Sequence, residues 1–173
     1  MCSSDLGAIW SPEFFGDVAV VNGKVWPNHQ VDRGLYRFRI VNGSNARFYN
    51  LRLASNATVP MYQIGTDGGF LNAPVPIAQL LIAPGERADI LLDFSRLRAG
   101  DRVVVTNNAV TPYPNGPRSL RQGGSPIKEI MQFTVTSKTG FQGPIPQRLR
   151  ATPIPTLTPS KVRNVSIVEV MGM

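Results

Sequence analysis

The side chains that most often carry catalysis or bind metals are scarce in this sequence. One histidine, His29, and one cysteine, Cys2, occur among 173 residues. They are too few for a four-cysteine, a two-cysteine/two-histidine or a three-histidine metal centre, and a lone cysteine cannot form a disulfide within the chain. A catalytic histidine also needs an orienting carboxylate and a nucleophile. Asp32 follows His29 closely, but no serine in a strained turn accompanies them, so we expect an ordinary loop histidine.

Carboxylates at two turns are the next candidates for chemistry. Asp67 lies in the segment 65–69, whose sequence is Gly-Thr-Asp-Gly-Gly. This segment lacks the run of oxygen ligands of a calcium loop and the strand–helix context of a phosphate-binding glycine loop, so we expect Asp67 to cap its own turn. Glu86, Arg87 and Asp89 are expected to form a network of charges at a turn and a strand edge.

Aromatic side chains offer a different kind of site. Trp10, Trp26 and Tyr113 could form a platform on which a sugar ring stacks, because aromatic rings present large flat apolar faces. They are scattered over three segments, however, so roles in packing or in contacts between domains are favoured.

The net charge of +7 raises the question of an anionic partner. A basic half of the chain could bind a polyanion such as a nucleic acid. Its basic residues do not cluster, so nucleic-acid binding is not favoured and a solvated or interface-facing surface is expected. The basic residues of this half stand against a single acid, Glu129: Arg102, Arg118, Arg121, Lys128, Lys138, Arg148, Arg150, Lys161 and Arg163.

The elements that position these residues are predicted to be strands. Charged residues make up 17% of the chain, below the usual 25% or so, and the sequence holds 16 Gly and 15 Pro. Apolar and polar residues alternate nearly throughout, which is typical of half-buried strands, and Asn22-Gly23 is a strong hairpin-turn signal. No segment has three turns of amphipathic helix. An all-β sandwich or barrel of about eight strands is therefore expected, with strands over 17–21, 24–26, 35–41, 48–54, 61–64, 77–83, 87–94, 102–107 and 129–136.

Proline-rich stretches indicate how the chain is divided. Residues 108–127 are expected to form a long loop between the last two strands, and the prolines after residue 138 favour an extended linker. We expect four parts: a leader at 1–9, non-native or without fixed structure; a domain at 10–137; a linker at 138–161; and, at 162–173, the first strand of a following domain cut short. No run is apolar over the roughly 20 residues of a membrane span, no signal peptide is recognised, and the compartment stays unknown.

Several motifs, in order, resemble one known family. Residues 14–17 (Phe-Phe-Gly-Asp) and 20–27 (Val-Val-Asn-Gly-Lys-Val-Trp-Pro) resemble the entry to the middle cupredoxin domain of bacterial multicopper oxidases. The likeness is greatest to the group of bilirubin oxidases, spore-coat laccases and phenoxazinone synthases. Residues 36–51, 63–69, 81–94 and 130–135 resemble later motifs of the same domain, and 163–169 resembles the opening strand of the next domain. The motif residues expected to have structural roles are Asn22, Gly23, Trp26, Arg37, Arg39, Asn42, Asp67, Gly68, Gly69, Glu86, Arg87 and Asp89.

The resemblance implies a cupredoxin-like Greek-key fold with a Pro-rich C-terminal extension, and a role without chemistry of its own. Enzymes of this family oxidise phenols, bilirubin-like pigments or metal ions at one copper and reduce O2 to water at a three-copper cluster. Their copper ligands come from the first and third domains, as His-x-His pairs and a His-Cys-His run. No such motif occurs here, so no catalytic, cofactor or metal residue is assigned and copper is expected only in the parent enzyme.

The expected function is therefore that of a scaffold that helps to form the substrate cleft. Its partners would be the flanking cupredoxin domains, and the faces they cover would promote self-association of the isolated domain. Neither a membrane nor a nucleic acid is an expected partner. Two alternatives stay open: a stand-alone binding module for a polyanion or glycan, and a small hydrolase that uses Asp67 and His29.

Overall fold

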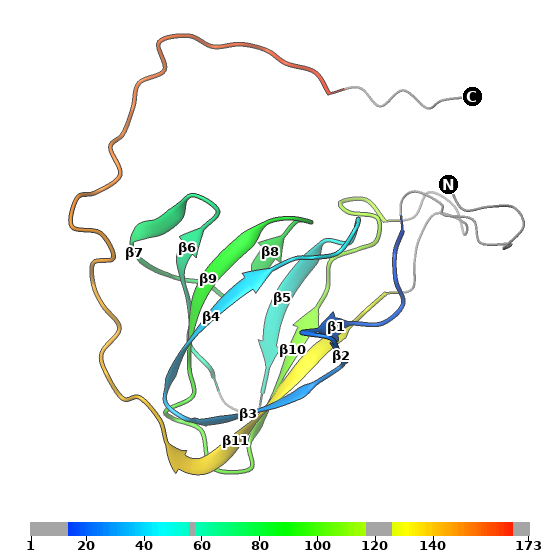
Figure 1. Cartoon of the computed structure of the whole chain (residues 1–173), viewed down its shortest axis with the longest axis vertical. Coiled ribbons are helices and arrows are strands. Elements are labelled where there is room, and N and C mark those ends of the chain that lie inside the picture. The colour runs from blue at the N-terminus through cyan, green and yellow to red at the C-terminus, as the bar shows by residue number, and fades with distance from the viewer. Residues whose placement is uncertain (1–13, 56–57, 117–125, 168–173) are drawn as a thin grey trace, which may run out of the picture.

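The computed structural model describes residues 14–55, 58–116 and 126–167, and their secondary structure is entirely strand (Figure 1). None of these residues forms a helix that could cross a bilayer. The all-β prediction is thus confirmed. The strands are β1 (Val20–Val21), β2 (Lys24–Val25), β3 (Asn28–Arg33), β4 (Leu35–Val41), β5 (Tyr49–Ala54), β6 (Met61–Thr66), β7 (Gly69–Pro76), β8 (Leu80–Ile82), β9 (Arg87–Asp93), β10 (Arg102–Asn107) and β11 (Glu129–Thr139).

Two larger sheets face each other as the layers of a sandwich, and a small hairpin lies at one side (Figure 1). One sheet has the order β3-β11-β10-β5-β8 and the other β4-β9-β6-β7, while β1 and β2 pair with each other. Strands β3 and β11 run parallel; the other neighbouring strands are antiparallel. The chain passes from one sheet to the other at Gly34, between β3 and β4.

The core lies between the two sheets, where the predicted alternation places it. Ile90 and Leu92 of β9 are buried, and Phe94 beyond them is fully buried. Its ring lies 5.3 Å from that of Phe133 on β11, which in turn lies 5.2 Å from Phe38 on β4. Fully burying a side chain of this size stabilises the fold by about 1.5–3 kcal/mol. Because Phe38 and Phe133 belong to different sheets, their contact joins the two layers.

The structure contains two strands that the sequence pattern did not predict. Strand β7 contains Pro74 and Pro76, which argue against a strand, but it is an edge strand, where a missing N–H donor is tolerated. Strand β3 is also an edge strand, and it gives no alternating signal because Val31 alone in its first four residues is buried. The prediction of a loop at His29 is therefore wrong. The strand expected over 77–83 is also shorter, because only Leu80–Ile82 pairs with β5.

The chain after β11 has no strand in its described part. It lies against the junction of β3 and β4, continues beside β7 and then leaves the sandwich (the orange to red part of Figure 1). Close contact at the start of this segment requires a glycine, since a Cβ on Gly34 would lie 2.6 Å from the carbonyl oxygen of Phe141. The expectation of a first strand of a following domain within 162–173 stays a prediction: residues 162–167 form no strand, and 168–173 lie outside the described residues.

Candidate functional site

The hairpin motif residues form a rigid turn with a half-exposed indole. Asn22 and Gly23 have φ of +49° and +78°, as a two-residue type I′ turn requires, and the predicted turn is confirmed. Trp26 also has a positive φ, +41°, which is unusual for a bulky residue. Its backbone N–H donates to Ala19 (3.0 Å) and its indole Nε1–H donates to the carbonyl of Glu129 (3.0 Å). These bonds hold the indole at the surface beside β11.

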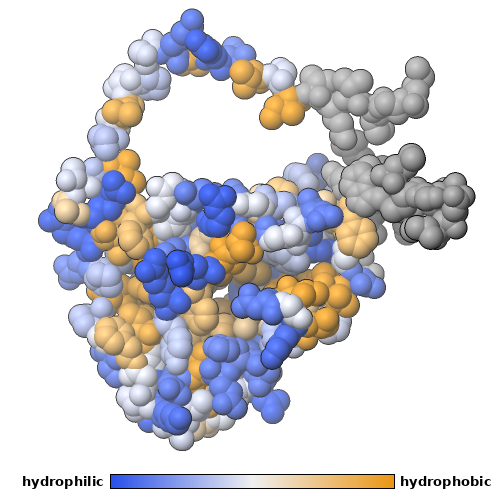
Figure 2. Space-filling model, viewed as in Figure 1, coloured by the Kyte–Doolittle hydropathy of each residue, from blue (hydrophilic) through white to orange (hydrophobic). Residues whose placement is uncertain are grey.

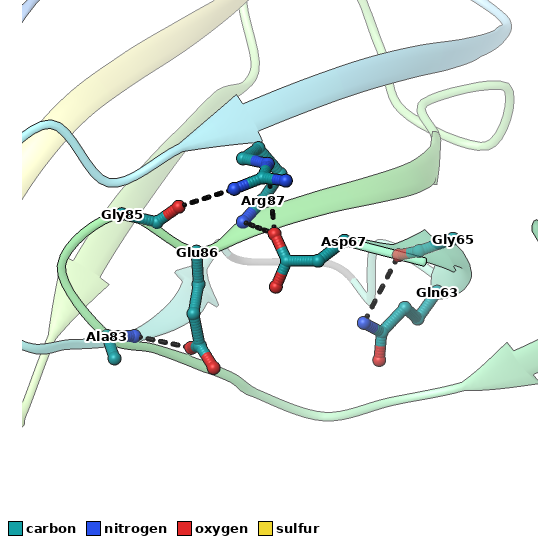
Figure 3. Close-up of polar contacts among 7 residues, drawn as sticks. All are labelled: Gln63, Gly65, Asp67, Ala83, Gly85, Glu86 and Arg87. Atoms are coloured by element: carbon teal, nitrogen blue, oxygen red, sulfur yellow. Dashed lines mark hydrogen bonds and ion pairs between the residues drawn. The ribbon is translucent and has the colours of Figure 1, made fainter. Parts of the chain in front are cut away.

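Asp67 contacts a neighbouring strand, not its own turn. Its Oδ1 accepts a hydrogen bond from the backbone N–H of Arg87 (2.8 Å) and lies 3.0 Å from that guanidinium Nε (Figure 3). The antiparallel register of β6 and β9 pairs Gly65 with Asp89, and continuing it brings position 67 opposite position 87. The prediction of a self-capping turn is thus corrected. The turn itself consists of Asp67 and Gly68, and Gly69 begins β7 opposite Thr66.

The second turn carboxylate has a different partner. Glu86 Oε2 accepts from the backbone N–H of Ala83 (2.7 Å), and Arg87 Nη1 donates to the carbonyl of Gly85 (3.0 Å). Figure 3 shows the Asp67 carboxylate turned toward Arg87 and the Glu86 carboxylate turned away toward Ala83. The two carboxylates do not converge on one point, so they do not form an acid/base pair or a cation site.

The outer face of the four-stranded sheet carries an ion pair. Arg37 on β4 donates through Nε to Asp89 Oδ1 (2.8 Å) and through Nη2 to Oδ2, a two-point contact. Hydrogen bonding to Asp89 raises the pKa of the Arg37 guanidinium. That guanidinium also lies 5.1 Å from the ring centre of Phe70, a cation–π distance. Arg39 is exposed and directly opposite Asp89 in the β4–β9 register. We call Arg37, Asp67, Arg87 and Asp89 the exposed network.

A second group of polar residues is buried. Asn42 donates through Nδ2 to the carbonyls of Arg47 (2.8 Å) and Ile82 (3.1 Å), and its Oδ1 accepts from the N–H of Ser44 (3.0 Å). It therefore joins the end of β4 to the end of β8. Within the described residues, the buried polar side chains are Asn42, Arg47, Asn107 and Thr111, and we call them the buried polar set.

Arg47 is the charged member of this set. It is 2% exposed, and burial lowers the pKa of its guanidinium. Its Nη1 donates to Thr111 Oγ1 (2.7 Å) and its Nη2 to the carbonyl of Gly16 (2.6 Å), while the ring of Phe15 lies 5.8 Å away. Arg47 thus holds the start of the domain and the 108–116 loop to the β4–β5 turn.

Asn107 makes a similar junction at the end of β10. Its Oδ1 accepts from the N–H groups of Asn50 (2.8 Å) and Ala109 (3.0 Å), and its Nδ2 donates to the carbonyl of Ile127 (2.9 Å). No pattern in the sequence marks Arg47, Asn107 or Thr111 as special. Their partners lie up to 64 residues away in sequence, so no local signal identifies them.

His29 lies on β3, and its ring contacts an aromatic side chain, not an ionisable group. The ring is exposed and makes an edge contact with Phe133 at 6.2 Å, and Asp32 is hydrogen bonded to Thr136 instead. Over 14–55, 58–116 and 126–167, no three His, Cys, Asp or Glu side chains form a group that could hold a metal ion. Asp67 and His29 belong to different sheets, so the geometry does not support the hydrolase alternative.

The aromatic and basic candidates also have separate surroundings. Tyr113 stacks on Phe48 at 4.6 Å, Trp26 is bonded to Glu129, and Trp10, like Cys2, lies outside the described residues. The described basic residues between 102 and 163 are exposed and spread over β10, the residue before β11, β11 itself and the C-terminal segment. An open groove of about 620 Å³ carries no charged side chain in its lining: Leu53, Ser55, Thr58, Val59, Pro60, Met61, Tyr62, Pro76, Ile77 and Ala78.

Comparison with known proteins places this sandwich in a family. The family model described as multicopper oxidase matches residues 12–119. Over 163 residues the chain is 39% identical to a laccase of Bacillus stratosphericus, covering 93% of this chain and 30% of the laccase. Over 109 residues it is 47% identical to "Multicopper oxidase LPR1 homolog 5" of Oryza sativa subsp. japonica, covering 62% of this chain and 17% of that protein.

A solved structure agrees with these matches. The crystal structure of the McoA multicopper oxidase from Aquifex aeolicus superposes with a TM-score of 0.70 and 38% identity, over 84% of this chain and 32% of that one. The chain thus spans about a third or less of the length of these relatives. The expected resemblance and the cupredoxin-like fold are confirmed. The chain belongs to the multicopper oxidase family, and its β-sandwich is a cupredoxin domain of such an enzyme.

Proposed function

We propose that this chain is the middle domain of a copper-dependent oxidase, where it holds two flanking cupredoxin domains in register and forms part of the substrate cleft. The parent enzyme would oxidise phenols or pigments, as laccases and bilirubin oxidases do, and couple this to the reduction of O2 to water. The short span of the chain relative to its relatives supports this division of labour.

The donor chemistry of the described residues does not fit copper. Copper sites in proteins use imidazole and thiolate ligands, and the contacts of the one imidazole here, His29, are with Phe133 of the core and not with another donor. We therefore assign copper binding to other parts of the parent enzyme and derive no electron-transfer step from this chain.

The observation that carries the proposal is an apolar surface on the β1–β2 hairpin. Val20, Val25 and Trp26 are 59, 53 and 52% exposed, and Figure 2 shows hydrophobic side chains gathered over these two strands. Ala19, directly before β1, is buried in the core and its carbonyl accepts from the N–H of Trp26, so the hairpin is anchored while Val20, Val25 and Trp26 stay exposed. Exposed apolar patches of this kind mark protein–protein contacts.

Self-association of the 173-residue chain tests this surface. We expect light scattering to show masses above the monomer that increase with concentration, and the double variant Val20→Thr/Val25→Thr to return the mass toward the monomer. Threonine keeps the β-branched shape that suits a strand. Val41→Thr is the matched control, because Val41 is equally apolar and 63% exposed at the end of β4.

Two results would overturn the proposal. A chain that stays strictly monomeric at high concentration would show that the hairpin surface does not mediate protein–protein contacts. Stoichiometric copper with an intense blue absorption in the purified chain would show that the domain has a copper centre of its own. Retention on heparin that survives moderate salt would instead favour a polyanion-binding module.

A further inference from the structure

The segment after β11 is attached to the sandwich at its start. The N–H of Gly140 donates to the carbonyl of Arg33 (2.9 Å), and the carbonyl of Phe141 accepts from the N–H of Leu35 (2.8 Å). These bonds bracket Gly34, whose missing side chain allows the close approach. The chain therefore begins its path along the sandwich at a fixed point.

One residue of β7 holds the same segment a second time. The backbone carbonyl of Asn72 accepts from the N–H of Leu149 (2.9 Å), and its side-chain Oδ1 accepts from the N–H of Ile154 (2.7 Å). Strand β7 is the edge of its sheet, so its outer backbone groups are available for such contacts. In Figure 1 this part of the chain lies beside β7.

The sequence of the segment suits a stiff connection. Pro144 and Pro146 precede the first contact with Asn72, and Pro153 and Pro155 flank Ile154. Proline fixes φ and restricts the residue before it to extended conformations, and proline-rich linkers act as semi-rigid spacers. Little conformational entropy is therefore lost when Asn72 binds this segment.

The attachment ends at Ile154. Every described residue from 155 to 167 is exposed, and Ile167 is fully exposed. Figure 1 shows this part of the chain leaving the sandwich. Residues 150–154 are exposed as well, but Leu149 and Ile154 donate to Asn72. Exposure then rises from 50% at Ile154 to 80% at Leu157, and this rise marks where the held part of the linker stops.

We propose that the edge of β7, through Asn72, is a docking surface for residues 149–154, and that this contact fixes where and in which direction the chain leaves toward the next domain. Asn72 is then a positioning residue for the assembly of the parent enzyme, and the linker is a rigid spacer. The functional part of this inference rests on the proposed role as a middle domain.

Amide hydrogen exchange in the 173-residue chain tests the contact directly. We expect the Ile154 N–H to exchange at least tenfold more slowly than the N–H groups of Val165 and Ile167. Asn72→Ala removes the Oδ1 acceptor and should bring Ile154 close to the rate of Val165. Asn72→Asp is the matched control, since a carboxylate oxygen can still accept this bond. Asn72 is exposed, so the thermal midpoint should barely change.

Trypsin provides a second readout with internal controls. Arg148 directly precedes the held segment and Arg150 lies within it, whereas Lys161 and Arg163 lie beyond Ile154, in the part that has left the sandwich. We expect cleavage first at Lys161 and Arg163, and a several-fold rise in cleavage at Arg150 in Asn72→Ala alone.

Equal exchange at Ile154 and Val165 in the unaltered chain would overturn the docking contact. An unchanged Ile154 rate in Asn72→Ala would show that the side chain does not hold the segment. Both failures are distinguishable from failure of the proposed scaffold role, because that role is tested by association and copper binding, which do not depend on Asn72.

Discussion

The exposed network lies on the four-stranded sheet and its β6–β7 turn, whereas the buried polar set lies at strand ends and in loops, and the two groups differ in what they join. The exposed network links neighbouring strands through side-chain pairs that water can reach, such as Arg37 with Asp89. The side chains of the buried polar set bind backbone groups of segments far away in sequence: Arg47 donates to the carbonyl of Gly16, and Asn42 donates to the carbonyl of Ile82. The first group contains the carboxylates that attract a functional interpretation, but the second contains the interactions on which the fold depends.

The largest effect is expected for Arg47→Ala. This change leaves the carbonyl of Gly16 and the hydroxyl of Thr111 without their donor in a buried place and opens a cavity, so we expect a loss of about 3–5 kcal/mol in the free energy of unfolding. Urea denaturation measures it. Arg47→Lys keeps the charge but offers a single donor group, so its free energy of unfolding should lie between that of the unaltered chain and that of Arg47→Ala. A loss below about 1 kcal/mol in Arg47→Ala would remove the distinction between the two groups.

A somewhat smaller loss is expected for Asn42→Ala. Two carbonyls and one N–H lose their partner, which we expect to cost about 2–4 kcal/mol in urea denaturation. Asn42→Asp sharpens the test. Its carboxylate still accepts from Ser44 but faces the carbonyls of Arg47 and Ile82 with no donor, so it should be at least as destabilising as alanine. If Asn42→Asp were neutral, the two Nδ2 bonds would not be the stabilising ones.

The same contrast explains how far the sequence predicts this molecule. Alternation along 35–41 and 87–94 identifies strands β4 and β9 and their inward faces, because burial repeats every second residue. Edge strands escape this signal: β3 is mostly polar and β7 contains prolines, since neither must bury a whole face. The charge pattern marks Glu86, Arg87 and Asp89, but the expected network among these three is not what forms. Glu86 accepts from Ala83, Asp89 pairs with Arg37 and Arg87 pairs with Asp67, whose place the β6–β9 register determines.

The buried polar set could not be predicted, and the reason is physical. Arg47 looks like any turn arginine until the 108–116 loop and the segment at Gly16 close over it. Its burial depends on contacts between residues 31 and 64 positions apart, and a single sequence carries no record of such pairing. Of the residues chosen for structural roles, Asn42 alone turns out to belong to this set.

Within the exposed network, Arg37→Ala should have a modest effect. Arg37 and Asp89 side chains are 49% and 15% exposed, and ion pairs reached by solvent contribute about 0–1 kcal/mol. Because the hydrogen bond that Arg37 donates to Asp89 raises the pKa of the Arg37 guanidinium, the stabilisation is fully present below the unfolded pKa of that group. It is lost only as the pH rises through the still higher folded pKa.

The range from pH 6 to pH 9 ends about three units below any arginine pKa. The contribution of this pair to the free energy of unfolding should therefore not vary with pH in that range. A double-mutant cycle of Arg37→Ala with Asp89→Asn isolates the pair from the contact of Arg37 with Phe70. A coupling energy above about 2 kcal/mol would place this pair with the buried polar set instead.

The smallest effect is expected for Asp67→Asn, and this variant separates two uses of one carboxylate. The asparagine oxygen can still accept from the backbone N–H of Arg87, while the charge that faces the guanidinium is lost. Both side chains are well exposed, at 43% and 60%, so the loss should stay within about 0.5 kcal/mol. Asp67→Ala removes the backbone bond as well and should cost about 0.5–1.5 kcal/mol. If Asp67→Asn were as destabilising as Asp67→Ala, the charge and not the backbone bond would hold the β6–β7 turn to β9.

A hydrolytic activity that disappeared in Asp67→Asn while stability was preserved would restore the carboxylate to a catalytic role, which its two contacts with Arg87 give no reason to expect.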